Sequence, residues 1–170
     1  MKQAMIDYSK DSKNPLRDEC YTPKIAVDVI LKYIPKGLKI WEPSDTSGKI
    51  SSTLIDNGHV VIGTCTDFFE TETPKGTQAI ITNPPYSQKD KWIRRCFEIG
   101  LPFALLLPLT ALEGIERGKM YRQYGISLIV MDRRMNFTGG KGAWFNTSWF
   151  CHGFGSLPKN CIEFAEVKND

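Results

Sequence analysis

The stretch Gln78-Ala79-Ile80-Ile81-Thr82-Asn83-Pro84-Pro85-Tyr86 decides the fold that this sequence predicts. Residues 78–82 form a short apolar run, which is typical of a strand that is buried on both faces of a parallel sheet. Neither proline can donate a backbone hydrogen bond, and each one pushes the residue before it into an extended conformation. The stretch therefore predicts a central strand that ends abruptly in a stiff loop.

The loop carries groups that suit an amino group on a planar ring. The Asn83 side chain can accept a hydrogen bond through its carbonyl and donate through its amine, and Tyr86 offers a flat face for stacking. Acceptors of this kind hold an NH₂ group while the aromatic face stacks on the ring. An ordinary turn, with Asn83 as a turn residue and Tyr86 at the edge of the core, is the alternative interpretation. The position at the end of a strand favours a functional loop.

Strands and helices alternate outward from this loop. Helical spacing of apolar residues predicts helices over 23–34, 48–57, 87–99 and, more weakly, 111–124. Short strand-like runs predict further strands over 38–41, 59–63, 103–107, 126–131, 148–154 and 161–167. We therefore expect an α/β fold with a mostly parallel sheet, helices on both faces and an antiparallel strand near the C-terminal end. Ligands of such sheets bind at the carboxyl ends of the strands, where residues 42–48 and 83–86 would meet.

Length and composition predict one globular domain. The chain has 170 residues, of which 41% are hydrophobic and 24% charged, and this balance argues against disorder. Its longest apolar run, Phe103 to Leu107, is too short to span a membrane, and the N-terminus has no apolar segment of the signal-peptide kind. We expect a flexible polar arm over 1–18, a single domain over 19–170 without a separate target-recognition domain, and a cytoplasmic location.

Cysteine and charge patterns narrow the function classes further. The five cysteines are far apart and form no CxxC pair, so the sequence predicts free thiols in a reducing compartment, and no disulfide framework or metal site. His59 and His152 are expected to be structural. The net charge of +3 permits a nucleic-acid partner but does not require one.

The tetrapeptide Asn83-Pro84-Pro85-Tyr86 resembles the catalytic tetrapeptide of amino-group methyltransferases that use S-adenosylmethionine, chiefly DNA N6-adenine methyltransferases. The chain length and the ending Ser148-Trp149-Phe150-Cys151-His152-Gly153 look most like small phage-encoded members of that group. The resemblance implies a class I, Rossmann-like methyltransferase fold. It also implies that Asn83, Pro84, Pro85 and Tyr86 are the catalytic residues.

Three further segments resemble the cofactor-binding parts of the same family. They are Cys20-Tyr21-Thr22-Pro23 before the first helix, Trp41-Glu42-Pro43-Ser44 continuing to Gly48, and Asp67-Phe68-Phe69. The resemblance implies S-adenosylmethionine binding by Tyr21, Thr22, Pro23, Glu42, Pro43, Ser44, Asp45, Gly48, Asp67 and Phe68. A turn that leads into a helix N-terminus is suited to a carboxylate, and acidic side chains are suited to ammonium, hydroxyl or adenine amino groups. The family's third strand is missing or very short here, and Thr46 stands where the family usually has glycine.

Candidate nucleic-acid contacts follow the tetrapeptide and recur late in the chain. Lys89, Lys91 and Arg94 are suited to backbone phosphates, although Asp90 dilutes their charge and a solvated helix face is the alternative. Phe145 is a candidate wall of the base pocket. We therefore expect methyl transfer to N6 of adenine in DNA. The alternatives are RNA adenine, the glutamine amide of a protein, and a binding protein that kept the fold but lost most of its catalysis.

Overall fold

The computed structural model describes residues 22–44, 47–64, 67–135, 137 and 146–168. Its α-helices are α1 (Lys24–Leu31), α2 (Lys49–Asp56), α3 (Lys89–Ile99) and α4 (Ile115–Tyr124), and short 3-10 helices η3 (Tyr86–Gln88) and η4 (Leu109–Leu112) precede the last two. The strands are β1 (Lys39–Glu42), β2 (Val60–Gly63), β3 (Ala79–Thr82), β4 (Phe103–Pro108), β5 (Ser127–Met131), β6 (Thr147–His152) and β7 (Ile162–Ala165). These elements follow the predicted alternation of strands and helices.

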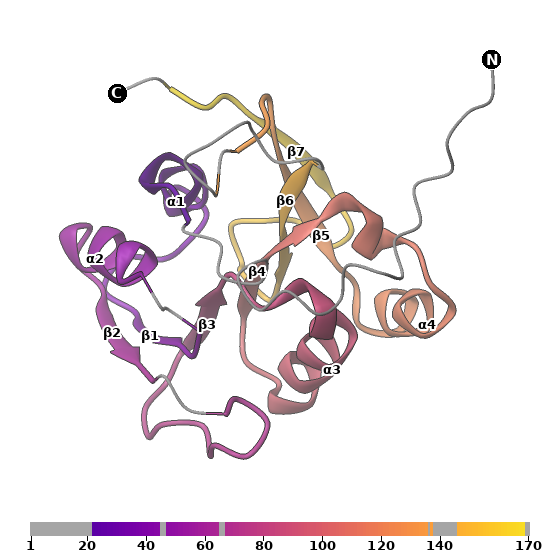
Figure 1. Ribbon diagram of the computed structural model, residues 1–170, viewed down its shortest axis with the longest axis horizontal. Coiled ribbons are helices and arrows are strands. Elements are labelled where there is room, and N and C mark those ends of the chain that lie inside the picture. Colours follow the sequence, from indigo (N-terminus) through magenta and orange to yellow (C-terminus); the bar gives the residue numbers. More distant parts are fainter. Residues whose placement is uncertain (1–21, 45–46, 65–66, 136, 138–145, 169–170) are drawn as a thin grey trace.

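The strands form one sheet in the order β2-β1-β3-β4-β6-β5-β7 (Figure 1). Strands β2, β1, β3 and β4 pair in parallel, whereas β6 runs antiparallel to both of its neighbours, β4 and β5. The expected mostly parallel sheet with a late antiparallel strand is confirmed. The fold is therefore an α/β fold of the doubly wound kind, with helices on both faces.

The sequence also predicts that the last two strands pair with each other and that residues 59–63, a short apolar run, form a strand buried on both faces, and both predictions were wrong. The last two strands do not pair with each other, because β4 and β5 already occupy both edges of β6, and β7 instead pairs in parallel with the outer edge of β5. Strand β2 is not buried on both faces either, and its Val60 is 59% exposed. It is an edge strand, since no described residue between Gly63 and Ala79 lies in a strand that would cover it.

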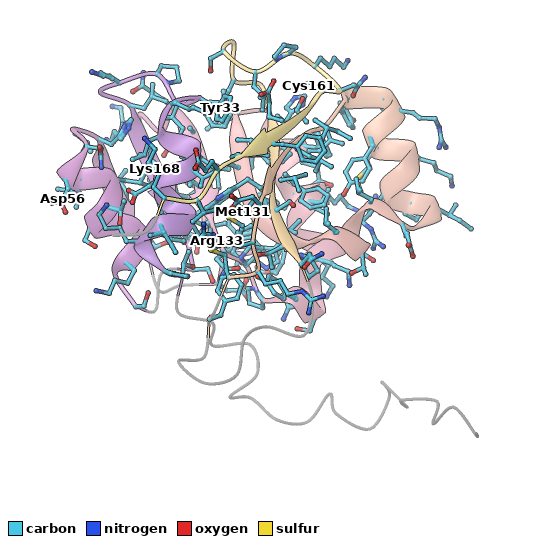
Figure 2. All side chains as sticks on the ribbon, turned by 90° about the horizontal axis from the view of Figure 1, so that it is seen from above. Tyr33, Asp56, Met131, Arg133, Cys161 and Lys168 are labelled. Carbon is cyan, nitrogen blue, oxygen red and sulfur yellow. The ribbon has the colours of Figure 1, made fainter. Side chains whose placement is uncertain are left out.

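Helices cover the two faces of the sheet as separate layers. Alternating residues of β4 show the division: Ala104 and Leu106 pack with α1 and α2, while Phe103, Leu105 and Leu107 pack with α3 and α4. Figure 2 shows α1 and α2 on one side of the sheet and α4 on the other. The same view separates the edge where strands begin, marked by Cys161 before β7, from the edge where they end, marked by Met131 of β5.

The helix expected over residues 111–124 is divided at Gly114. This glycine has a φ of +131°, a conformation that side-chain-bearing residues rarely adopt, and it separates η4 from α4. No helix in the described ranges combines the length and the apolar character needed to cross a bilayer.

Candidate active site

The candidate site lies at the carboxyl edge of the sheet, between β1 and β3. The chain goes from β1 to β2 on one side and later places β3 on the other side of β1, so this is the point where the strand order reverses (Figure 1). Crevices for ligands open at such switch points. Glu42 is the last residue of β1, and Asn83 directly follows β3. The structure therefore brings together two of the segments that the sequence predicts to meet.

Glu42 is fully buried at the end of β1, where neighbouring groups orient its carboxylate. Its Oε1 accepts a 2.9 Å hydrogen bond from the Ser44 amide and a 2.5 Å hydrogen bond from the Thr82 hydroxyl. The Glu42 carbonyl also accepts from the Thr64 amide at 3.2 Å, which joins the ends of β1 and β2. Hydrogen bonds to a buried carboxylate make its position well defined.

Asn83 is joined to the segment that enters α1. Its Nδ2 donates to the hydroxyl oxygen of Thr22 at 3.1 Å, across 61 positions of the sequence. Thr22 is only 2% exposed, and Pro23 follows it with φ −65° and ψ 143° before α1 begins. Thr22 and the tetrapeptide therefore meet in one site.

The remaining residues of the tetrapeptide turn the chain from β3 into α3. Pro84 is buried and Pro85 half-buried, and the Pro85 carbonyl accepts from the Gln88 amide at 3.1 Å. Tyr86 begins η3 and packs, half-buried, against the core beneath α3 and α4. The abrupt end of the strand is confirmed, and Tyr86 follows it as a half-buried residue three positions after Asn83.

The turn after β1 leads to the exposed N-terminus of α2. Pro43 is buried and Ser44 half-buried, and Gly48 is the N-cap residue with a φ of +69°. A side chain built on Gly48 would meet nothing within 4 Å, so there is space beside this glycine, and the next amide, that of Lys49, donates to the Ser47 hydroxyl at 3.3 Å. Asp67 is exposed, and its Oδ1 accepts from the Phe69 amide at 2.8 Å.

Phe68 lies in the core, which differs from the position expected of a cofactor contact. Its ring is 2% exposed and stacks on Trp92 with the ring centroids 4.1 Å apart and the planes 5° apart. The Trp41 ring also packs on Phe68, at a centroid distance of 5.1 Å and a tilt of 50°. Because these two rings cover Phe68, it has almost no surface left for a ligand, and its role in the structure is packing.

The predicted phosphate contacts lie on α3, which leaves the carboxyl edge directly after the tetrapeptide. Lys91 and Arg94 are exposed and Lys89 is half-buried. The Arg94 Nη2 lies 4.0 Å from a carboxylate oxygen of Glu116 on α4, so part of its charge has a partner within the protein. Lys89 and Lys91 are therefore the stronger candidates for contacts with a phosphate backbone.

Some predicted residues lie outside the described residues. These are Tyr21, Asp45 and Phe145 among the site residues, together with Thr46, Cys65 and the N-terminal arm. The structural account of the site is confined to the other residues.

The two histidines and the buried cysteines of the described ranges lie away from this site. His152 is at the end of β6, opposite the start of β4, and its Nδ1 is 3.0 Å from the Gly125 carbonyl. His59 precedes β2 at the same edge, and burial lowers its pKa. Cys96 and Cys151 are free thiols whose burial raises their pKa, so they are protonated at neutral pH. Among the described residues, no group of three or more histidine, cysteine or acidic side chains is arranged to hold a metal ion.

Thr82 is a site residue that the sequence analysis did not single out. It is fully buried in β3, where its hydroxyl reaches Glu42, 40 positions earlier in the chain. A polar residue that ends the apolar run Ala79-Ile80-Ile81 is itself a signal, because a buried hydroxyl needs a hydrogen-bond partner.

Comparisons with known proteins identify the fold. No protein-family model matches the chain, and no curated protein matches it in sequence. Similar solved structures include a predicted O-methyltransferase from Agrobacterium tumefaciens, with a TM-score of 0.54 and 10% identity over 85% of this chain and 86% of that chain. The 23S rRNA methyltransferase ErmE is similar with a TM-score of 0.55 and 11% identity over 79% of this chain and 69% of that one.

A modification subunit of a putative type I restriction enzyme from Vibrio vulnificus is similar over nearly the whole chain. The TM-score is 0.59 and the identity 12%, and the match covers 95% of this chain but 49% of that one. This chain thus spans about half the length of that subunit. The shared fold is that of class I, Rossmann-like methyltransferases, as the sequence predicts.

Proposed function

We propose that this chain transfers a methyl group from S-adenosylmethionine to the N6 amino group of adenine in DNA. The observation that carries the proposal is the position of Asn83-Pro84-Pro85-Tyr86 at the end of β3, next to the buried Glu42 at the end of β1, in a methyltransferase fold. An acceptor amide with an aromatic ring beside it matches a planar ring that carries an amino group.

The residues present fit S-adenosylmethionine by their chemistry. When bound, this cofactor supplies an electrophilic methyl group on sulfur. Glu42 offers a fixed carboxylate for an ammonium or hydroxyl group, and the first turn of α2 offers backbone N–H groups for a carboxylate. Asp67 is exposed and is an acceptor suited to the adenine amine. Phe68 is left out of this set because its ring is buried in the core.

The proposed part of Asn83 is to polarise the amino group of the substrate. The lone pair of an adenine amine is delocalised into the ring, which makes the nitrogen a poor nucleophile. An acceptor on one of its hydrogens favours a pyramidal nitrogen and stabilises the positive charge that develops as the nitrogen–carbon bond forms and the sulfur–carbon bond breaks. The nitrogen then loses its extra proton to solvent, so this step asks for no strong base.

Transfer of tritiated methyl groups to DNA, RNA and protein in parallel tests this proposal. We expect label in DNA, and we expect prior heat denaturation of that DNA to speed the transfer, because a base must leave the duplex to enter the site. If label is found only in RNA or only in protein, that molecule and not DNA is the substrate. The similar structures include an rRNA methyltransferase as well as a restriction-modification subunit, which makes the RNA arm essential.

A calorimetric titration is expected to give a dissociation constant for S-adenosylmethionine on the order of micromolar or weaker. This corresponds to a binding free energy of about −8 kcal/mol or less favourable. The reason for modest affinity is Thr46, which stands where a glycine is usual in the resembling loop. Thr46→Gly should keep or improve binding. Absence of a binding signal at millimolar cofactor would contradict the methyltransferase proposal, whereas binding without transfer would support a non-catalytic relative.

Tyr86→Ala is expected to weaken base engagement by about 5- to 150-fold, because stacking of a base on an aromatic ring contributes roughly 1–3 kcal/mol. Tyr86→Phe should retain most of the engagement. Since Tyr86 also packs half-buried against the core, the free energy of unfolding of both variants must be measured beside the KM for DNA. Equal losses for the Ala and Phe variants would contradict a stacking role.

Replacing Lys89, Lys91 and Arg94 together by alanine is expected to flatten the dependence of log affinity for duplex DNA on log salt by about 0.9 for each lost phosphate contact. Lys89 and Lys91 should account for most of the change, because Arg94 lies beside Glu116. Titrations at several salt concentrations measure the slope.

The matched control removes the same charge from the opposite edge of the sheet. Lys36, Lys75 and Lys159 are exposed and precede β1, β3 and β7. Replacing these three by alanine should lower affinity only through net charge and keep the slope nearer to that of the wild type. An unchanged slope for the α3 variant would exclude these residues as phosphate contacts.

A further inference from the structure

The Asn83 side chain faces Thr22 with the nitrogen end of its amide. The amide nitrogen donates to the Thr22 oxygen at 3.1 Å, and the carbonyl oxygen of the same planar group therefore points away from Thr22. An asparagine without such a contact can exchange its two ends by rotation about its last side-chain bond. The Thr22 hydroxyl can pair with either end, and in this structure it pairs with the nitrogen end.

Thr22 is itself held in place by the fold. Ala26, one turn further along, donates its amide to the Pro23 carbonyl at 3.0 Å. The Ala26 carbonyl accepts a 2.7 Å hydrogen bond from the indole of Trp149, which is fully buried in β6. The start of α1 is thus tied to the middle of the sheet, and Thr22 is 2% exposed beside it. A buried hydroxyl on an anchored segment is a precise support for a neighbouring side chain.

A second contact restrains the backbone on the other side. Thr82 immediately precedes Asn83, is fully buried, and donates to Glu42 at 2.5 Å. The residue before Asn83 is therefore tied to β1, while the Asn83 side chain is tied to Thr22. Supports of this kind allow an acceptor to be in place before the substrate arrives, which is the condition for stabilising a developing charge.

We propose that Thr22 is a positioning residue, which holds the amide nitrogen of Asn83 so that the carbonyl oxygen is presented to the amino group of the substrate. This proposal rests on the proposed function and differs from the cofactor contact that the sequence analysis expects of Thr22. The two roles predict changes in different quantities. A positioning residue changes the rate at saturating cofactor, whereas a cofactor contact changes the dissociation constant of S-adenosylmethionine.

The test compares Thr22→Val and Thr22→Ser, each with Asn83 or with Asn83→Ala. Thr22→Val should lower kcat by about 3- to 10-fold, as the loss of one hydrogen bond does. The dissociation constant of the cofactor should change by less than about twofold, and Thr22→Ser should restore kcat. In the Asn83→Ala background, Thr22→Val should have no further effect, because a residue that acts through Asn83 has nothing left to position.

Thr53→Val is the matched control. Thr53 is a buried threonine of α2 whose hydroxyl donates to the Lys49 carbonyl at 2.8 Å, so this variant also loses a buried hydroxyl. It should keep the wild-type kcat. The free energy of unfolding of the ligand-free proteins gives a readout without cofactor: the effects of Thr22→Val and Asn83→Ala should be less than additive.

The outcomes separate this proposal from the proposed function. If the wild type neither binds cofactor nor transfers methyl groups, the proposed function is wrong and the role of Thr22 is wrong with it. If the wild type is active, three results would overturn the role of Thr22 alone. These are an unchanged kcat in Thr22→Val with unchanged cofactor affinity, an unchanged kcat with weakened cofactor affinity, and an equal loss of kcat with and without Asn83. Should Thr22→Val fail to fold, Thr22→Ala replaces it in the same comparison.

Discussion

Asn83→Ala is expected to lower the rate of methyl transfer by about 10²- to 10³-fold, the loss seen when one preorganised hydrogen-bonding group is removed from a reacting centre. The acceptor lies directly after β3, where the Pro84-Pro85 loop, Thr22 and the Thr82–Glu42 contact hold it. Cofactor affinity should change much less, because the interaction with the amino group is gained mainly in the transition state.

Rates at saturating cofactor, with cofactor binding and unfolding measured separately, check this result. Asn83→Asp is the second variant: it keeps an acceptor oxygen where the amide oxygen was, and its other oxygen replaces the amide nitrogen and can accept from the Thr22 hydroxyl. It should lose less activity than the alanine variant. A folded Asn83→Ala protein that binds cofactor and methylates adenine at a nearly wild-type rate would show that the active site lies elsewhere.

Phe68→Ala is expected to lower the free energy of unfolding by about 3–5 kcal/mol, as deletions of large buried aromatic side chains do. The ring is stacked on Trp92 and covered by Trp41, so its removal leaves a cavity between two tryptophans. Total stabilities of about 5–15 kcal/mol make this a large fraction of what holds the fold. Urea denaturation of the two proteins measures the difference.

Phe69→Ala is the matched control for this change. Phe69 is half-buried and meets the rings of Phe68 and Trp92 edge to face, so its loss should be clearly smaller. Phe68→Leu keeps most of the volume and should keep cofactor affinity. A Phe68→Leu protein with normal stability but strongly weakened cofactor binding would contradict the packing role and restore Phe68 as a cofactor contact.

The order of elements was predictable because apolar spacing and chain breakers are local signals. The strand before Asn83 and the helix after it were recognisable from the apolar run, the two prolines and the spacing of Trp92, Ile93, Cys96 and Phe97. The place of a strand in the sheet is not local. The apolar run of β2 is typical of a central strand. Val60 is nevertheless exposed, because β2 is the first strand in the order of the sheet and no described strand lies beyond it.

For the candidate site, the sequence could predict which segments lie close together, but not which side chains contact each other. The switch-point rule brings the ends of β1 and β3 to one edge, but it does not say that Thr82 reaches Glu42 or that Asn83 reaches Thr22. These pairs are 40 and 61 positions apart, and they depend on the register of β1 with β3 and on how α1 docks. For the same reason, Asp67 and Phe68 look equally accessible in the sequence, whereas the fold exposes the first and buries the second.

The identity of the methylated nucleoside tests the central proposal most directly. DNA is incubated with the protein and S-adenosylmethionine tritiated on the methyl group, digested to nucleosides and separated by chromatography. The account predicts that the label is recovered as N6-methyl-2′-deoxyadenosine and that Asn83→Ala reduces it by the factor given above. Label in a methylated cytosine or thymine nucleoside, or no label in DNA from a protein that binds the cofactor, would contradict it.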